Sequence, residues 1–178
     1  MTYELPFKPG QRLIELGGGA NPRIRPNVDV RPGPSTDLIA DFNKPLPLPS
    51  NQFDGILSVY VIEHLSWRNV RGFIVEVHRI LAPGGTAVLI TANTLEQMKN
   101  ALARERWDET VSSMLFGDLD YPENSHKAAF SPEYAVRLFK EAGFYEVTTL
   151  PHPETITDMI IQARKSAAVV SFSLLNPS

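Results

Sequence analysis

The feature that most constrains this chain is a short apolar run that ends in three consecutive glycines. Residues 13–22 read LIELGGGANP, and the apolar residues at the start are typical of a strand buried on both faces. Residues without a Cβ can adopt positive φ and bring backbone N–H groups against a ligand. The three residues that could do so here are Gly17, Gly18 and Gly19. They predict a nucleotide-binding loop at the carboxyl end of a first parallel strand, with a plain tight turn as the alternative.

The composition narrows the classes of protein and partner. A chain of 178 residues that is 43% hydrophobic is expected to form one domain with a full core. Its net charge of −3 does not favour nucleic acid as a partner. We expect a cytoplasmic protein with no membrane association, because the sequence has no apolar run near 20 residues and no N-terminal signal pattern. The absence of cysteine excludes disulfides, thiolate zinc sites and cysteine nucleophiles.

Proline shapes the connections after the glycines. Seven of the 15 prolines fall between Pro22 and Pro49, so the first crossover helices are expected to be abbreviated, with at most one helical turn near 22–25. Short strands are predicted at 27–30 and 37–40. Asp29 and Asp41 lie at or near their carboxyl ends. A nucleoside at the glycine loop directs its ribose toward the end of the next strand, where Asp29 could accept both hydroxyl protons. Alternatively, both aspartates cap turns.

Later segments predict further elements of an α/β protein. A turn rich in proline precedes an apolar run typical of a central strand, and a helix with an apolar stripe follows. A Pro-Gly-Gly sequence ends this helix before the next strand. Further on, Ser131 and Pro132 are typical of a helix start, and Gly143 is typical of a helix end. The expected ranges are strands at 53–59 and 86–91 and helices at 69–81, 95–107 and 132–142.

In this order the motifs resemble the class I methyltransferases that use S-adenosylmethionine, and most of all the short bacterial members of the type 11 group. The motifs are LIELGGG, NVDV, DLIADF, FDGILSVYVIEHL and HRILAPGGTAVLITAN. The resemblance covers residues 13–93 and resumes at 124–127 and 142–144. The chain departs from the group in carrying Gly-Gly-Gly where relatives often have Gly-Cys-Gly, and in lacking a leading helix.

The resemblance implies a fold. We expect an α/β three-layer sandwich with a mostly parallel, doubly wound sheet of seven strands, abbreviated N-terminal helices and an antiparallel last strand. The closing strands are expected at 144–150 and 157–163. The domain is expected to span 1–165, with an insertion at about 94–127 that covers the acceptor, and a C-terminal tail at 166–178. For the insertion, a dimer interface or core packing is the alternative, so a homodimer is left open.

The resemblance also implies S-adenosylmethionine as the cofactor and assigns residues to it. Gly17 and Gly19 would approach its amino-acid part and ribose, and Glu15 would hold a network below the loop. The expected cofactor-binding residues are Glu15, Gly17, Gly18, Gly19, Asp29, Val30, Asp41, Phe42, Val59 and Tyr60. A dinucleotide oxidoreductase is the natural rival, but Pro22 occupies the position of its third glycine.

Two histidines are candidates for a general base, which is needed only if the acceptor must lose a proton. They are His64, just past the central strand, and His126, in an Asn-Ser-His-Lys sequence. A structural role is the alternative for each. Some relatives bind a divalent ion through Glu-x-x-Glu-His and a distant histidine. Here Tyr60 replaces the first glutamate, so no metal site is expected.

The acceptor class is narrowed by absent motifs. Residues 58–61 read SVYV where amino-group DNA methyltransferases carry an Asp/Asn-Pro-Pro-aromatic sequence, and without cysteine a covalent C5-pyrimidine adduct cannot form. The sequence therefore predicts a methyltransferase for a small-molecule or sugar-type acceptor. The alternative function is a non-catalytic module that keeps the cofactor fold for binding or regulation.

Overall fold

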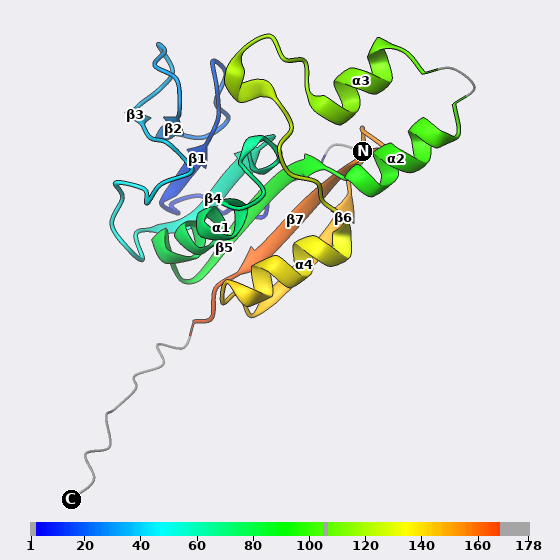
Figure 1. Cartoon of the computed structure of the whole chain (residues 1–178). Coiled ribbons are helices and arrows are strands. Elements are labelled where there is room, and N and C mark those ends of the chain that lie inside the picture. The colour runs from blue at the N-terminus through cyan, green and yellow to red at the C-terminus, as the bar shows by residue number, and fades with distance from the viewer. Residues whose placement is uncertain (1–2, 105–106, 168–178) are drawn as a thin grey trace, which may run out of the picture.

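A seven-stranded sheet forms the centre of the protein (Figure 1). The computed structural model describes residues 3–104 and 107–167. The strands are β1 (Leu13–Leu16), β2 (Asn27–Asp29), β3 (Leu38–Ile39), β4 (Phe53–Val59), β5 (Leu81–Ala92), β6 (Glu146–Pro151) and β7 (Asp158–Arg164). Their spatial order is β3-β2-β1-β4-β5-β7-β6. The pairs from β3 to β5 are parallel, whereas β7 runs antiparallel to both β5 and β6. The predicted fold class is confirmed.

Two amphipathic helices, α1 (Val70–Ile80) and α4 (Pro132–Glu141), lie on the same face of the sheet (Figure 1). The Ser131 hydroxyl caps α4 by accepting a hydrogen bond from the Tyr134 N–H at 3.2 Å. Two further helices, α2 (Thr94–Leu102) and α3 (Glu109–Phe116), follow β5. Short 3-10 turns lie at η1 (Ile62–His64) and η2 (Pro122–Asn124). Within the described residues, no helix combines the length and apolar character needed to cross a bilayer.

The two faces of the sheet are covered differently. The larger core cluster lies under α1 and α4, and its fully buried members include Ile14, Leu16, Ile56, Phe73, Ile74 and Phe139. The alternate residues of the strands form a smaller cluster on the opposite face, with Leu57, Val88, Ile90 and Ile160. Extended chain near the N-terminus, including Tyr3, Leu5 and Phe7, packs on this second cluster. The third layer is therefore extended chain in the described residues.

The connection from β1 to β2 contains no helical turn, although one turn near 22–25 was the most that the prolines allowed. The buried Glu15 carboxylate accepts hydrogen bonds from the N–H groups of Arg23 and Ile24, at 2.6 and 2.7 Å. Because these two N–H groups donate to the Glu15 side chain, they do not form helical hydrogen bonds, and the segment is irregular.

The helix expected at 95–107 is shorter in the structure, and a second helix follows it. The first, α2, ends at Leu102, and Asp108 starts α3 by accepting a hydrogen bond from the Thr110 N–H at 3.1 Å. An aspartate at this position favours a new helix start over continuation, because its side chain satisfies a free backbone donor. Most of the expected tail, residues 168–178, lies outside the described residues.

Candidate cofactor and acceptor site

The glycine loop follows β1 directly and has the backbone conformation that glycine favours. Gly17 and Gly19 have φ values of +80° and +58°. The Gly17 N–H donates to the Val28 carbonyl at 2.7 Å, which joins the loop to β2. A Cβ at Gly17 would lie 2.2 Å from Val61 Cγ2, whereas a Cβ at Gly19 would meet no atom within 4 Å. Gly17 is thus required for both its φ and its space.

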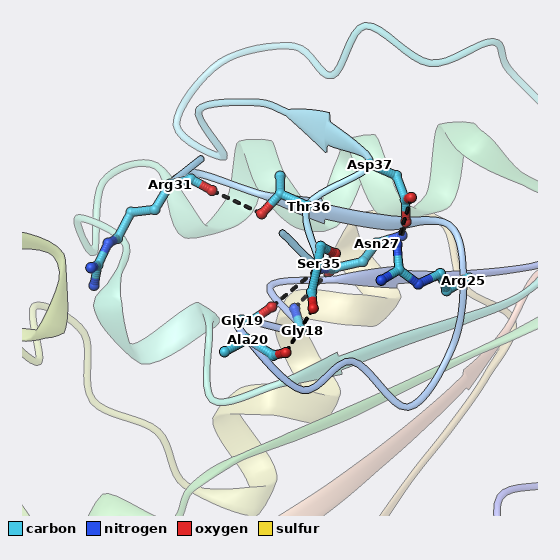
Figure 2. A network of polar contacts seen from close by, with 9 residues as sticks. All are labelled: Gly18, Gly19, Ala20, Arg25, Asn27, Arg31, Ser35, Thr36 and Asp37. Atoms are coloured by element: carbon cyan, nitrogen blue, oxygen red, sulfur yellow. Dashed lines mark hydrogen bonds and ion pairs between the residues drawn. The ribbon is translucent and has the colours of Figure 1, made fainter. Parts of the chain in front are cut away.

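The Asn27 side chain connects the glycine loop to the segment at Ser35 (Figure 2). This side chain is fully buried, and its Oδ1 accepts a hydrogen bond from the Gly18 N–H at 2.9 Å. Its Nδ2 donates to the carbonyls of Gly19 and Ser35, at 3.3 and 2.9 Å. The Ser35 hydroxyl in turn donates to the Ala20 carbonyl at 2.8 Å. The sequence predicts a strand at Asn27 and no further role, because no local sequence pattern indicates that its amide contacts two loops.

Glu15 supports the loop without lining a cavity. It is 2% exposed, and burial raises the pKa of its carboxyl group, while the hydrogen bonds from Ile24 and Arg23 oppose this rise. Val59, which was also expected beside the cofactor, packs against the second core cluster. These two residues and Gly18 lie behind the cavity wall that the other candidates form.

The two aspartates expected near the cofactor lie at the carboxyl end of the sheet. The half-buried Asp29 accepts hydrogen bonds from the N–H groups of Gly19 and Arg31, both at 3.0 Å. The Asp41 carboxylate accepts one from the Asn43 N–H at 2.9 Å, and this bond is the main cause that lowers the pKa of Asp41. Asp41 therefore remains charged at neutral pH.

A cavity of about 470 Å³ connects these residues. Seven of the expected cofactor-binding residues line it, namely Gly17, Gly19, Asp29, Val30, Asp41, Phe42 and Tyr60. The segment between β5 and α4 contributes Tyr121, Glu123 and Lys127 from the other side. The Arg31 guanidinium lies over the Tyr121 ring, 4.2 Å from its centroid. The contribution of Tyr121 and Lys127 was not predicted, because they come from a segment far along the chain.

A second cavity of about 310 Å³ adjoins the first, and Tyr60 and His64 line both. Tyr60 has a φ of +54° at the end of β4, and its hydroxyl donates to Asp158 Oδ2 at 2.7 Å. Burial, followed by this bond to Asp158, raises the pKa of the Tyr60 phenol. The phenol is therefore neutral and acts as a donor. Asp158 lies 98 positions further along the chain and was not predicted.

The two candidate bases lie side by side at the boundary between the cavities. The ring centroids of His64 and His126 are 5.1 Å apart. His64 Nδ1 lies 3.2 Å from the Ser125 carbonyl, which can only accept, so this nitrogen carries the proton and Nε2 is left for another partner. Burial is the main cause that lowers the pKa of both imidazoles. Both are therefore neutral at pH 7 and can take up a proton.

Glu63 completes this group and is 1% exposed. Burial raises its pKa to about 7, while contributions from Thr91 and Ala92 oppose the rise. A ligand atom of Glu63, one of His64 and one of His126 all lie within 4.8 Å of one another. The arrangement has the donor types of a metal site, whereas the sequence predicts no metal.

A model of the family described as Methyltransferase domain matches residues 25–89, which run from the loop before β2 into β5. Over these residues the chain is similar to a methyltransferase domain, and the family that the model describes binds S-adenosylmethionine. The match takes in Asp29, Asp41 and the Glu63–His64 pair.

Comparisons with individual proteins agree with this assignment. The methyltransferase domain is 28% identical over 149 residues to the human probable tRNA methyltransferase 9B, and the match covers 67% of this chain and 32% of that protein. The chain thus spans about a third of the length of this curated relative.

Two solved structures show the same fold. One is an S-adenosylmethionine-dependent methyltransferase from Mesorhizobium loti, with a TM-score of 0.62, 19% identity and coverage of 88% of this chain and 91% of that one. The other is phosphoethanolamine N-methyltransferase 2 from Haemonchus contortus in complex with S-adenosyl-L-methionine, with a TM-score of 0.63 and 12% identity. That match covers 90% of this chain and 50% of the other.

Proposed function

We propose that this methyltransferase domain transfers a methyl group from S-adenosylmethionine in the first cavity to a small-molecule or sugar-type acceptor in the second. The observation that carries this proposal is the junction of the two cavities at Tyr60 and His64. A transfer between two bound molecules needs neighbouring sites with a shared wall, so that acceptor and methyl can be aligned.

The residues of the first cavity fit the cofactor chemically. A Cβ at Gly19 would meet no atom within 4 Å, so the loop backbone is open there and a ligand can lie against it. The Asp29 carboxylate can accept hydrogen bonds from a ribose diol, each worth about 1.5–3 kcal/mol. We propose that Asp41 accepts from the adenine amino group and that the Phe42 ring packs against the base. When bound, the cofactor supplies a methyl group on a sulfonium, and the neutral thioether that remains after transfer is a good leaving group.

The residues of the second cavity fit an acceptor of limited size. Its volume of about 310 Å³ is at the lower end of the usual range for small-ligand pockets. We propose His64 as the general base where the acceptor must lose a proton, because its Nε2 is not used by Ser125. His126 is the second candidate. Tyr60, held by Asp158, would orient the acceptor at the junction.

The cofactor assignment is tested by calorimetric titration with S-adenosylhomocysteine. We expect micromolar binding by the wild type and at least tenfold weaker binding by Asp29→Ala, which corresponds to about 1.4 kcal/mol. Asp54→Ala is the matched control, because Asp54 in β4 pairs with Arg12, which directly precedes β1, and Asp54 lines neither cavity. Absence of binding by folded wild-type protein would refute the proposed cofactor site.

The acceptor class is tested by transfer of a labelled methyl group to a panel of small molecules, sugars and tRNA. The relative named as a probable tRNA methyltransferase makes tRNA the informative macromolecular member of this panel. We expect labelling of small molecules. Labelling of tRNA alone would refute the small-molecule acceptor. Cofactor binding without turnover of any acceptor would favour the non-catalytic alternative.

A further inference from the structure

The second cavity has an acidic lining without a basic counterpart. Its carboxylates are Glu63, Asp118 and Asp158, and neither lysine nor arginine occurs among its described lining residues. Its two imidazoles are the neutral ones described above. Such a cavity attracts a positively charged ligand and repels phosphates and carboxylates.

The carboxylates differ in their hydrogen bonding. Asp158 accepts from the Tyr60 hydroxyl, and Asp118 accepts from the Ser113 hydroxyl. Glu63 is buried, and neither of its carboxylate oxygens makes a hydrogen bond of ordinary geometry to a described residue. Burial without a partner disfavours the charged carboxylate and raises the pKa of Glu63 to about 7, so an ammonium that reaches it stabilises the charged form and gains a strong interaction. Glu63 is therefore the strongest acceptor that this cavity offers to a ligand.

We propose that the methyl acceptor is an amine, which enters the second cavity as an ammonium ion with Glu63 as its main anionic partner. This inference rests on the proposed function and names the acceptor class of the same site. An ammonium carries up to three donors and no acceptor, which matches a wall of carboxylate oxygens and the free imidazole nitrogen. A sugar fits this inference when it carries an amino group.

The chemistry of an amine acceptor uses the two imidazoles. The ammonium gives one proton to His64 Nε2, and the freed nitrogen lone pair faces the first cavity. A new N–C bond then forms as the S–C bond breaks, the positive charge passes to the nitrogen, and S-adenosylhomocysteine leaves neutral. The N-methylated ammonium and the proton on His64 return to solvent. His126, with its centroid 5.1 Å from that of His64, neighbours the group that receives the proton.

A divalent metal ion is the rival occupant, because the donor atoms of Glu63, His64 and His126 lie within 4.8 Å of one another. The two occupants make opposite predictions. An amine acceptor leaves turnover unchanged by chelation, whereas a metal that holds the acceptor makes turnover fall when the ion is removed.

The experiment compares amines with alcohols on the same skeleton. Benzylamine and benzyl alcohol, ethanolamine and ethylene glycol, and glucosamine and glucose are titrated into the complex with S-adenosylhomocysteine and then tested for methyl transfer. We expect each amine to bind at least about tenfold more tightly than its partner, a difference of about 1.4 kcal/mol. Equal binding of the pairs, or binding of no amine, would overturn the inference. The affinity of the wild type for S-adenosylhomocysteine without any amine shows whether the cofactor site works. Normal affinity there, with no preference for amines, would overturn only the amine inference.

Two variants locate the amine. Glu63→Gln is expected to raise the KM or dissociation constant for the amine at least about tenfold with unchanged affinity for S-adenosylhomocysteine. Glu109→Gln, on the exposed first turn of α3, is the matched control. Unchanged amine affinity in Glu63→Gln would overturn the inference. So would stoichiometric Zn²⁺ binding that is lost in Glu63→Gln and His126→Gln, together with loss of turnover in chelator.

A measurement on wild-type protein covers the case in which Glu63→Gln does not fold. The chain has four histidines, so their ring signals in NMR spectra are few and assignable. An amine in the second cavity is expected to shift the signals of His64 and His126 and to leave those of His78 and His152 in place. Shifts confined to His78 and His152 would overturn the inference.

Discussion

Replacing Gly17 by alanine tests whether the glycine loop is held by contact as well as by backbone conformation. A positive φ costs a residue with a Cβ about 1–2 kcal/mol. The added Cβ would also lie 2.2 Å from Val61 Cγ2, whereas carbon atoms in contact are about 3.5–4.0 Å apart. Such overpacking costs about 1–3 kcal/mol. We therefore expect Gly17→Ala to lower the free energy of unfolding by about 2–5 kcal/mol.

Gly19→Ala is the matched control for this substitution. Gly19 has φ +58°, and a Cβ there meets nothing within 4 Å, so only the backbone cost of about 1–2 kcal/mol applies. Urea denaturation of both variants gives the difference. The double variant Gly17→Ala/Val61→Ala is expected to recover about 1–3 kcal/mol relative to additive single changes. Equal losses at both glycines, or additive effects in the double variant, would refute the contact with Val61 as the reason for Gly17.

Three further predictions concern single side chains and the hydrogen bonds that they make. Asn27→Ala removes one acceptor and two donor contacts that the buried Asn27 side chain makes with the glycine loop and with Ser35, so urea denaturation should show a loss of at least about 2 kcal/mol and calorimetry a weaker affinity for S-adenosylhomocysteine. Tyr60→Phe leaves the buried Asp158 without its 2.7 Å donor; the free energy of unfolding should fall by about 1–3 kcal/mol, and an unchanged value would contradict this contact. Glu76 accepts hydrogen bonds from Arg79 and the Leu46 N–H, and the bond to Arg79 is the main cause that lowers the pKa of Glu76. The stabilisation by the charged Glu76 is therefore present above the ordinary glutamate pKa and is lost as pH falls through the lowered value. Glu76→Gln should lower the free energy of unfolding by about 1–3 kcal/mol at neutral pH, and the difference between the variant and the wild type should shrink in acid.

The sequence predicted the elements whose signals are local. The apolar runs at β1 and β4, the stripe of α1 and the cap at Ser131 each act within a few residues, so their positions could be predicted to within a few residues. The end of α2 at Leu102 was missed because no glycine or proline marks it. No helical turn forms near 22–25, where at most one was expected, and the buried Glu15 carboxylate instead accepts hydrogen bonds from the backbone there.

The candidate site could be predicted only where order along the chain determines position. Parallel strands bring their carboxyl ends to one edge, so Asp29 and Asp41 follow the glycine loop to the same cavity. Asp158 reaches Tyr60 only because β7 pairs with β5 in antiparallel register, with Asp158 opposite Ala92. The neighbourhood of His64 and His126 depends on the path of a loop 62 positions later, which no local pattern determines.

The contact between Arg31 and Tyr121 joins two segments that line the first cavity, and the second of these segments leads on toward the proposed acceptor site. Arg31 neighbours Asp29 at the cofactor end, whereas Tyr121 precedes the turn η2 that leads to His126. Cofactor binding that shifts Arg31 and so favours one placement of Tyr121 must change the affinity for the acceptor. Because binding free energies are linked reciprocally, acceptor binding must then change the affinity for the cofactor by the same factor. A cation–π contact of about 0.5–2 kcal/mol limits this coupling to roughly 2- to 30-fold. A single arginine and a single ring would therefore link the affinities of the two proposed sites.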